Sequence, residues 1–166
     1  SMAFGPDGRK LTSNGNGLGM LAVWDVIDAK QIVSKRAHDE VVPCVTFADD
    51  GRLVAAGTYK RATIWTFDNG DMRHTYRTGN TVCSVAFGPE GKLLATGDCD
   101  DMILLWDVAT ATAVWRKSSP DTLSMEFSPD GKLLATGGLD NLIHLWDVAT
   151  GDQRGQFVGH KDAVVS

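Results

Sequence analysis

The sequence has little cysteine, no excess of positive charge and no long hydrophobic run. Three cysteines, at positions 44, 83 and 99, include no Cys-x-x-Cys pair, so we expect reduced thiols and a cytoplasmic location. Sixteen Lys and Arg against 21 Asp and Glu give a net charge of −5, which argues against binding of nucleic acid or an anionic membrane surface. No apolar stretch approaches the roughly 18 residues of a membrane span.

Groups that catalyse reactions or bind metals are also sparse. The four histidines are scattered, and none stands beside a cysteine or a second histidine at zinc-ligand spacing. The glycine-rich run 14–19 lacks the Lys-Ser/Thr that completes a phosphate loop. Asp98, Asp100 and Asp101 do not have the spacing of an EF-hand loop. The sequence therefore predicts no enzyme, no cofactor and no metal site.

Two sets of aromatic residues recur with a period of about 40. Four tryptophans are spaced by 41, 41 and 40 residues, and four phenylalanines by 43, 40 and 40. They are Trp24, Trp65, Trp106 and Trp146, and Phe4, Phe47, Phe87 and Phe127. A turn of the Pro-Asp-Gly type follows each phenylalanine. The pattern predicts one domain over residues 1–166 with four repeats, about 1–42, 43–82, 83–122 and 123–166.

Each repeat divides into short runs of strand length. In the third repeat these runs are 82–87, 92–96, 102–106 and 113–117, separated by turn residues. The two middle runs are apolar on both faces, as in a strand whose sheet is covered on both sides. No window of ten or more residues keeps a helical period. We predict an all-β fold of four-stranded antiparallel sheets stacked face to face.

The strings at 104–108 (Leu-Leu-Trp-Asp-Val) and 145–148 (Leu-Trp-Asp-Val), the Gly159-His160 pair and the Phe-x-Pro-Asp-Gly turns resemble WD-repeat β-propellers. The similarity covers the whole chain. It implies four-stranded blades arranged radially around a channel.

The resemblance also implies a hydrogen-bonded tetrad of His, Ser or Thr, Asp and Trp in each blade. The third repeat offers Thr96, Asp100 and Trp106 and the fourth Thr136, Asp140 and Trp146, but both lack the histidine, expected near Thr78 and Ser118. In the second, Ala55 and Tyr59 stand in the hydroxyl and carboxylate places, and in the first Asn14 and Leu18. We expect Asp100 and Asp140 to accept backbone N–H groups of their own turns. The full set of signature residues is Trp24, Asp25, His38, Trp65, Thr96, Asp100, Trp106, Asp107, Thr136, Asp140, Trp146, Asp147, Gly159 and His160.

The two ends of the chain align with complementary halves of one innermost strand. Residues 1–4 match its second half and residues 163–166 its first half. Propellers of this family usually have about seven or eight blades, so four blades make about half a ring. We expect a homodimer that closes an eight-bladed ring, with 163–166 completing the strand begun at residue 1 of the second copy. The alternatives are a fragment of a longer propeller and a tightly wound four-bladed monomer.

The resemblance implies a non-catalytic scaffold that binds a protein or peptide on the loop face of the ring. Loops on a rigid framework are where binding residues accumulate, and the acidic balance favours a basic partner segment. The candidate partner-binding residues are Asp39, Glu40, Tyr59, Lys60, Arg61, Asp98, Asp101 and Asn141. The alternative is an architectural self-assembly module, or an engineered propeller fragment, whose role is to form a closed ring by homodimerisation.

Overall fold

The computed structural model describes residues 1–14, 19–36, 39–67, 70–120 and 122–165. They form four antiparallel four-stranded sheets, which confirms the all-β prediction and is consistent with propeller blades. Blade 1 contains β1 (Met2–Phe4), β2 (Lys10–Asn14), β3 (Met20–Asp25) and β4 (Lys30–Arg36). Blade 2 contains β5 (Cys44–Phe47), β6 (Leu53–Thr58), β7 (Arg61–Thr66) and β8 (Met72–Arg77). Blade 3 contains β9 (Val82–Phe87), β10 (Leu93–Asp98), β11 (Met102–Asp107) and β12 (Thr112–Ser118), with a 3₁₀ turn, η1 (Pro89–Gly91), after β9. Blade 4 contains β13 (Thr122–Phe127), β14 (Leu133–Gly138), β15 (Leu142–Asp147) and β16 (Gln153–Val158).

The strands of each blade follow one another in sequence order and pair with their immediate neighbours. The repeat extends to a detail of register, because the pairing of the third and fourth strands shifts at the tryptophan of every blade. The shifts fall at Trp24, Trp65, Trp106 and Trp146. Such a bulge increases the local twist of the two strands.

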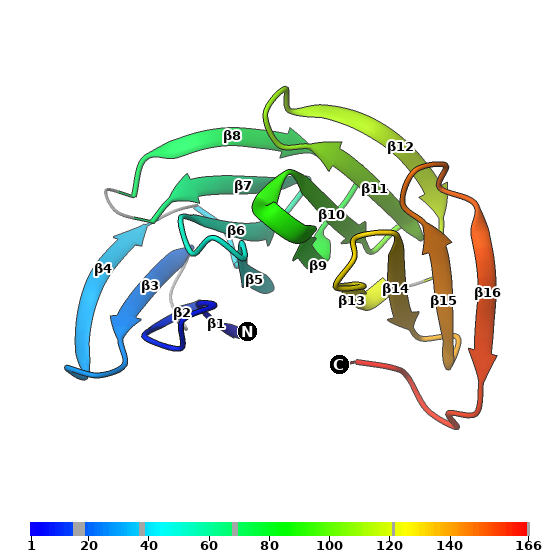
Figure 1. The fold of residues 1–166 in the computed structure, drawn as a ribbon, viewed down its shortest axis with the longest axis horizontal. Helices are drawn as coiled ribbons and strands as arrows, with labels where there is room; N and C mark the ends of the chain where they lie inside the picture. Colours follow the sequence, from blue (N-terminus) through cyan, green and yellow to red (C-terminus); the bar gives the residue numbers. More distant parts are fainter. Residues whose placement is uncertain (15–18, 37–38, 68–69, 121, 166) are drawn as a thin grey trace.

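The four blades form an open arc with the first strand of each blade on the inside and the fourth on the outside (Figure 1). Three apolar cores fill the spaces between successive blades. Neighbouring residues of a third strand serve different cores: Ile64 packs toward blade 3 and Trp65 toward blade 1. This alternation explains why the middle strands are apolar on both faces.

Close backbone contacts set the spacing of the innermost strands. A Cβ atom built on Gly57 would lie 2.6 Å from Val82, and one on Gly97 would lie 2.9 Å from Thr122. At Gly137 the corresponding neighbour is Val164, at 2.5 Å. Val164 therefore occupies, against blade 4, the place that the first residue of β9 occupies against blade 2.

Two outer faces of the arc, one on blade 1 and one on blade 4, have no neighbouring blade of this chain, and exposed apolar side chains lie at these two ends. The repeat tryptophans of blades 2, 3 and 4 each pack on the preceding blade and are 7% exposed or less. Trp24 has no preceding blade to pack on, and it is 37% exposed. The exposed apolar side chains include Met2, Phe4 and Trp24 on blade 1 and Phe157 on blade 4. Both chain ends lie on the inner side of the arc and face each other across its opening (Figure 1).

The expectation of reduced thiols is wrong for two of the three cysteines. Cys83 on β9 and Cys99 in the turn after β10 form a disulfide, with their Cα atoms 6.3 Å apart. Pairing of Val82 with Asp98 at the end of this hairpin brings the two side chains together. Cys44 is free, and burial raises the pKa of its thiol to about 12. The cytoplasmic assignment thus loses the support that it took from reduced thiols.

Among the described residues, no helix has both the length and the apolar character required to cross a bilayer.

Candidate functional site

Each tryptophan–hydroxyl pair ties the second and third strands of a blade together. The indole Nε1 of Trp106 donates to Thr96 Oγ1 and that of Trp146 to Thr136 Oγ1, both at 3.0 Å and both buried. In blade 1, Trp24 Nε1 donates to Ser13 Oγ, also at 3.0 Å. The sequence alignment was therefore one residue out in blade 1, because it assigned the hydroxyl place to Asn14. The pairing of Leu11 with Trp24 sets the observed register.

Blade 2 shows the same one-residue offset. Val54 pairs with Trp65 in the way that Leu94 pairs with Trp106, so Ala56 rather than Ala55 stands at the hydroxyl position. Neither Ala55 nor Ala56 has a side chain that can accept a hydrogen bond from an indole.

A serine extends the network of blade 4 where the family pattern has histidine. Ser119 Oγ lies 3.3 Å from Thr136 Oγ1 and accepts a hydrogen bond of 3.0 Å from Thr122 Oγ1. Its side chain is 1% exposed. The residue lies one position beyond Ser118, where the histidine was expected, so sequence alignment missed it. Buried hydroxyl groups that satisfy one another replace the missing imidazole.

The buried carboxylate of blade 3 belongs to Asp98 rather than Asp100. Asp98 is 0% exposed and accepts backbone N–H groups of Gly79, Asp100 and Met102 at 3.1–3.3 Å. Its assignment to the partner-binding set is therefore wrong, because it lies at the end of β10 with its carboxylate turned into the protein. Asp100 is exposed and accepts a hydrogen bond of 2.6 Å from Asn80 Nδ2, not the backbone groups expected.

Blade 4 contains a carboxylate–imidazole pair that the sequence did not reveal. His144 Nε2 lies 2.7 Å from Asp140 Oδ2, and its Nδ1 lies 2.9 Å from Gln153 Nε2. Asp140 Oδ1 also accepts the N–H of Leu142 at 3.1 Å, as expected for a carboxylate that organises its own turn. Since the amide nitrogen of Gln153 donates to Nδ1, the imidazole proton is on Nε2 and points to Asp140. His144 is 8% exposed, and all its ring nitrogens are occupied within the blade.

The aspartates that follow the repeat tryptophans form turns rather than a catalytic group. Asp25 Oδ1 accepts two backbone N–H groups at 2.9 Å. Asp107 accepts from the backbone and hydroxyl of Thr110, and these hydrogen bonds lower the pKa of its carboxyl. The pKa of Asp147 is lowered too, first by its hydrogen bond with Arg154 (2.6 Å) and then by backbone N–H groups of its turn.

The exposed candidates gather on the loops between the second and third strands. Lys60, Asp101 and Asn141 occupy equivalent turn positions and all have positive φ, 59°, 59° and 65°. Tyr59 is 48% exposed, and Lys60 Nζ lies 5.0 Å from the centre of its ring.

One ion pair links this turn of blade 2 to the segment before blade 2, and a second links that segment to the end of β4. Arg61 lies 4.0 Å from Glu40, and Arg36 lies 3.4 Å from Asp39. Beside the turn, a shallow hollow of about 230 Å³ is lined by Tyr59, Lys60, Arg61, Thr75 and Arg77.

The remaining signature residues add no chemistry to this face. Gly159 and His160 are exposed in the segment after β16, and His38 lies outside the described residues. Over the part of the chain that the structure describes, no group of three His, Cys, Asp or Glu side chains could hold a metal ion.

Comparison with known proteins places these features in context. The family described as "WD domain, G-beta repeat" matches residues 29–66, 70–107 and 114–147. The WD repeat and SOCS box-containing protein 1 of Xenopus tropicalis is 34% identical over 109 residues, which are 63% of this chain and 26% of that protein. The human protein of the same name gives the same values. A WD repeat-containing protein WDS homolog of Arabidopsis thaliana is 31% identical over 57% of this chain and 20% of its own length. The chain thus spans about a quarter or less of these relatives.

Proposed function

Because the chain belongs to the WD-repeat family, whose members generally act as protein-interaction scaffolds, we propose that it is a non-catalytic scaffold that binds a protein or peptide on its loop face. The observation that carries the proposal is the cluster formed by Tyr59, Lys60, Arg61 and Arg77 around the hollow on blade 2. An exposed aromatic ring beside guanidinium groups is typical of the residues that dominate protein interfaces.

The cluster is presented by a rigid turn. Lys60 N donates to Asn80 O at 3.1 Å, and Lys60 O accepts the N–H of Thr78 at 3.0 Å. These bonds tie the turn to the loop that leads to the next blade. A preorganised loop loses little conformational entropy on binding. The positive charge of the cluster favours an acidic partner segment at this spot, although the net charge of the chain alone favours a basic one.

Capture of partners from a lysate, followed by binary titration with each purified candidate, tests the proposal. The double substitution Tyr59→Ala and Arg61→Ala should abolish binding of a captured partner. Arg116→Ala should not, because Arg116 is an exposed arginine of β12 in blade 3 and does not line the hollow. Thermal unfolding of both variants would show that the fold is intact. Identical binding by wild type and the double variant would contradict the proposed surface.

The second candidate function is self-assembly, and the exposed outer faces of the arc favour it. Met2, Phe4 and Trp24 on blade 1 and Phe157 on blade 4 leave apolar surface exposed at the two ends of the arc, and exposed apolar surface of this kind commonly marks a protein interface. We propose that a second copy covers both faces and closes an eight-bladed ring. Val164, already seated against Gly137, would then begin the innermost strand that β1 of the second copy completes.

Light scattering after gel filtration tests this closure. Wild type should have a mass near twice 17.8 kDa, and Trp24→Lys should shift it to the monomer, whereas Tyr59→Ala should leave the dimer intact. A wild-type monomer at every concentration would overturn closure by a second copy.

A further inference from the structure

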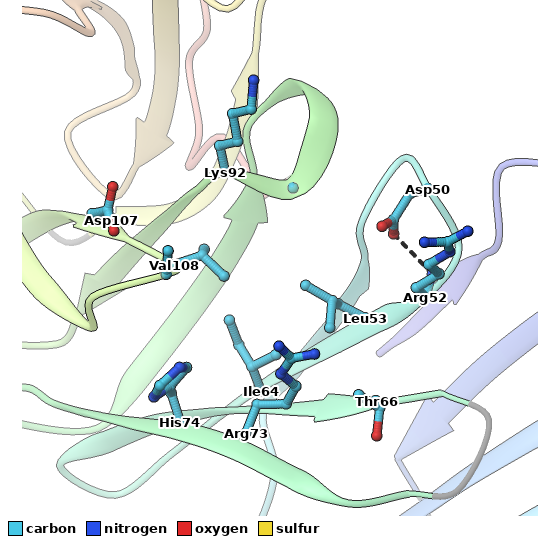
Figure 2. Close-up of a pocket in the computed structure, with 12 residues that line it drawn as sticks. Asp50, Arg52, Leu53, Ile64, Thr66, Arg73, His74, Lys92, Asp107 and Val108 are labelled. Atoms are coloured by element: carbon cyan, nitrogen blue, oxygen red, sulfur yellow. Dashed lines mark hydrogen bonds between the residues drawn. The ribbon is translucent and has the colours of Figure 1, made fainter.

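A pocket of about 690 Å³ lies between blades 2 and 3. It is at the opposite end of the strands from the loop face, where the turns between the second and third strands carry the Tyr59 cluster. Figure 2 shows its lining residues, which include the apolar side chains of Leu53 and Ile64 from blade 2 and Val108 from blade 3. Arg52, Arg73 and His74 line the same pocket from blade 2. Its volume lies within the range of about 300–1,000 Å³ typical of ligand sites.

The equivalent space between blades 3 and 4 explains why this pocket is open. There, Leu93 and Val148 line a smaller hollow of about 420 Å³. Trp115 pairs with Leu105 as His74 pairs with Ile64, so an indole stands where blade 2 has an imidazole. The Trp115 Nε1 group donates to Val148 O at 2.8 Å and holds the ring against blade 4.

Blade 2 satisfies the corresponding carbonyl in another way. Tyr76 donates its hydroxyl to Val108 O at 3.3 Å, and burial raises its pKa to about 12. The interface therefore keeps its hydrogen bond without an indole, which leaves the space beside His74 unfilled. At the bulge, Arg73 of blade 2 stands where blade 3 has Val114, so the open pocket also gains a guanidinium.

The charged groups around the pocket are unequally engaged. Lys92 is paired with Glu90 at 2.5 Å. Asp50 Oδ1 accepts the backbone N–H of Arg52 at 2.8 Å, and Asp107 Oδ1 accepts two hydrogen bonds from Thr110. Within the part of the chain that the structure describes, no carboxylate lies at ion-pair distance from Arg52 or Arg73. Two guanidinium groups without a carboxylate partner among the described residues, beside an apolar floor, are complementary to a carboxylate that neighbours an apolar side chain.

We propose that this pocket is a second binding site, which takes an extended acidic peptide segment of a partner protein. One aliphatic side chain of the segment packs on Leu53, Ile64 and Val108, and flanking carboxylates bind Arg52 and Arg73. The site is separate from the Tyr59 cluster, since the two lie at opposite ends of blade 2. A partner could therefore contact either rim alone.

Fluorescence anisotropy with a labelled peptide, acetyl-Glu-Glu-Leu-Glu-Glu-amide, tests the proposal on the full chain. Wild type should bind the peptide saturably, and binding should weaken as salt is raised. Arg73→Val should weaken binding roughly threefold to fivefold, as expected for loss of one partly exposed ion pair. Arg73→Val combined with His74→Trp, which reproduces the residues of blade 3, should abolish it. Peptides with Gln for Glu, or with Gly for Leu, should each bind more weakly.

Arg116→Val is the control for general charge effects, because it removes an exposed arginine from β12 that does not line the pocket, and it should leave binding unchanged. Absence of saturable binding to wild type would overturn the proposal, as would equal binding by wild type and the double variant. Neither result would bear on the Tyr59 cluster, which its own variants test.

Discussion

The repeat tryptophans offer a matched pair of substitutions that tests how blades stabilise one another. Trp106 is 7% exposed and packs against blade 2, whereas Trp24 is 37% exposed because no blade precedes it. Both indoles donate a 3.0 Å hydrogen bond to a hydroxyl group, Thr96 or Ser13. The pair therefore differs chiefly in the presence of a neighbouring blade.

We expect Trp106→Ala to lower the free energy of unfolding by about 3–5 kcal/mol, since it removes a buried indole and leaves a cavity. This loss is a large part of the roughly 5–15 kcal/mol that stabilises a typical domain. Trp24→Ala should cost about 1–2 kcal/mol, because the side chain packs only within its own blade and is partly in water already.

Urea unfolding followed by circular dichroism, at several protein concentrations, measures both losses. Equal losses for the two variants at low concentration would refute the reasoning that each tryptophan is stabilised by the preceding blade. A cost for Trp24→Ala that grows with protein concentration would instead show that a second copy covers this face.

Three further features can be tested individually. Asp98→Asn should destabilise the protein by about 1.5–3 kcal/mol in urea unfolding, because an amide cannot replace a buried carboxylate that accepts three backbone N–H groups, whereas Asp100→Asn should be nearly neutral. The folded state lowers the pKa of Asp147 below its ordinary value of 3.8, so the stability that this carboxylate contributes is present above pH 3.8 and is lost as the pH falls through the folded pKa. Asp147→Asn should therefore flatten the acid limb of a curve of stability against pH. An unchanged acid limb would contradict the assignment. Non-reduced peptide mapping should recover Cys83 linked to Cys99, and Cys83→Ser should cost about 3 kcal/mol for a loop of this length; three titratable thiols in the unreduced, denatured protein would refute the disulfide.

The architecture was accessible from sequence because the landmarks of the repeat are local. Each phenylalanine, turn and tryptophan marks a definite strand end, so the spacing alone predicts four sheets of four strands. Burial of β10 and β11 on both faces likewise agrees with their apolar composition. These features depend on neighbours in the chain and on hydrophobicity, which a sequence displays directly.

The polar details were less accessible because they depend on offsets of one or two residues. Ser119 rather than Ser118, and Asp98 rather than Asp100, complete the buried networks of blades 4 and 3. Either member of each pair fits the composition, and only the bulges and turn conformations decide between them. The inter-blade pocket was missed for another reason. It is open because His74 stands where blade 3 has the larger Trp115, and this equivalence depends on the strand pairing of the two blades.

The alternation of side chains along each third strand determines how far a disturbance can travel. Ile64 and Trp65 are adjacent in the chain, yet one faces blade 3 and the other blade 1. Each blade therefore shares a core only with the blade or blades next to it, as in a linear array with nearest-neighbour coupling. A change in the loops of one blade weakens with every interface that it crosses, so the loops of distant blades can diverge independently while the framework that carries them stays the same.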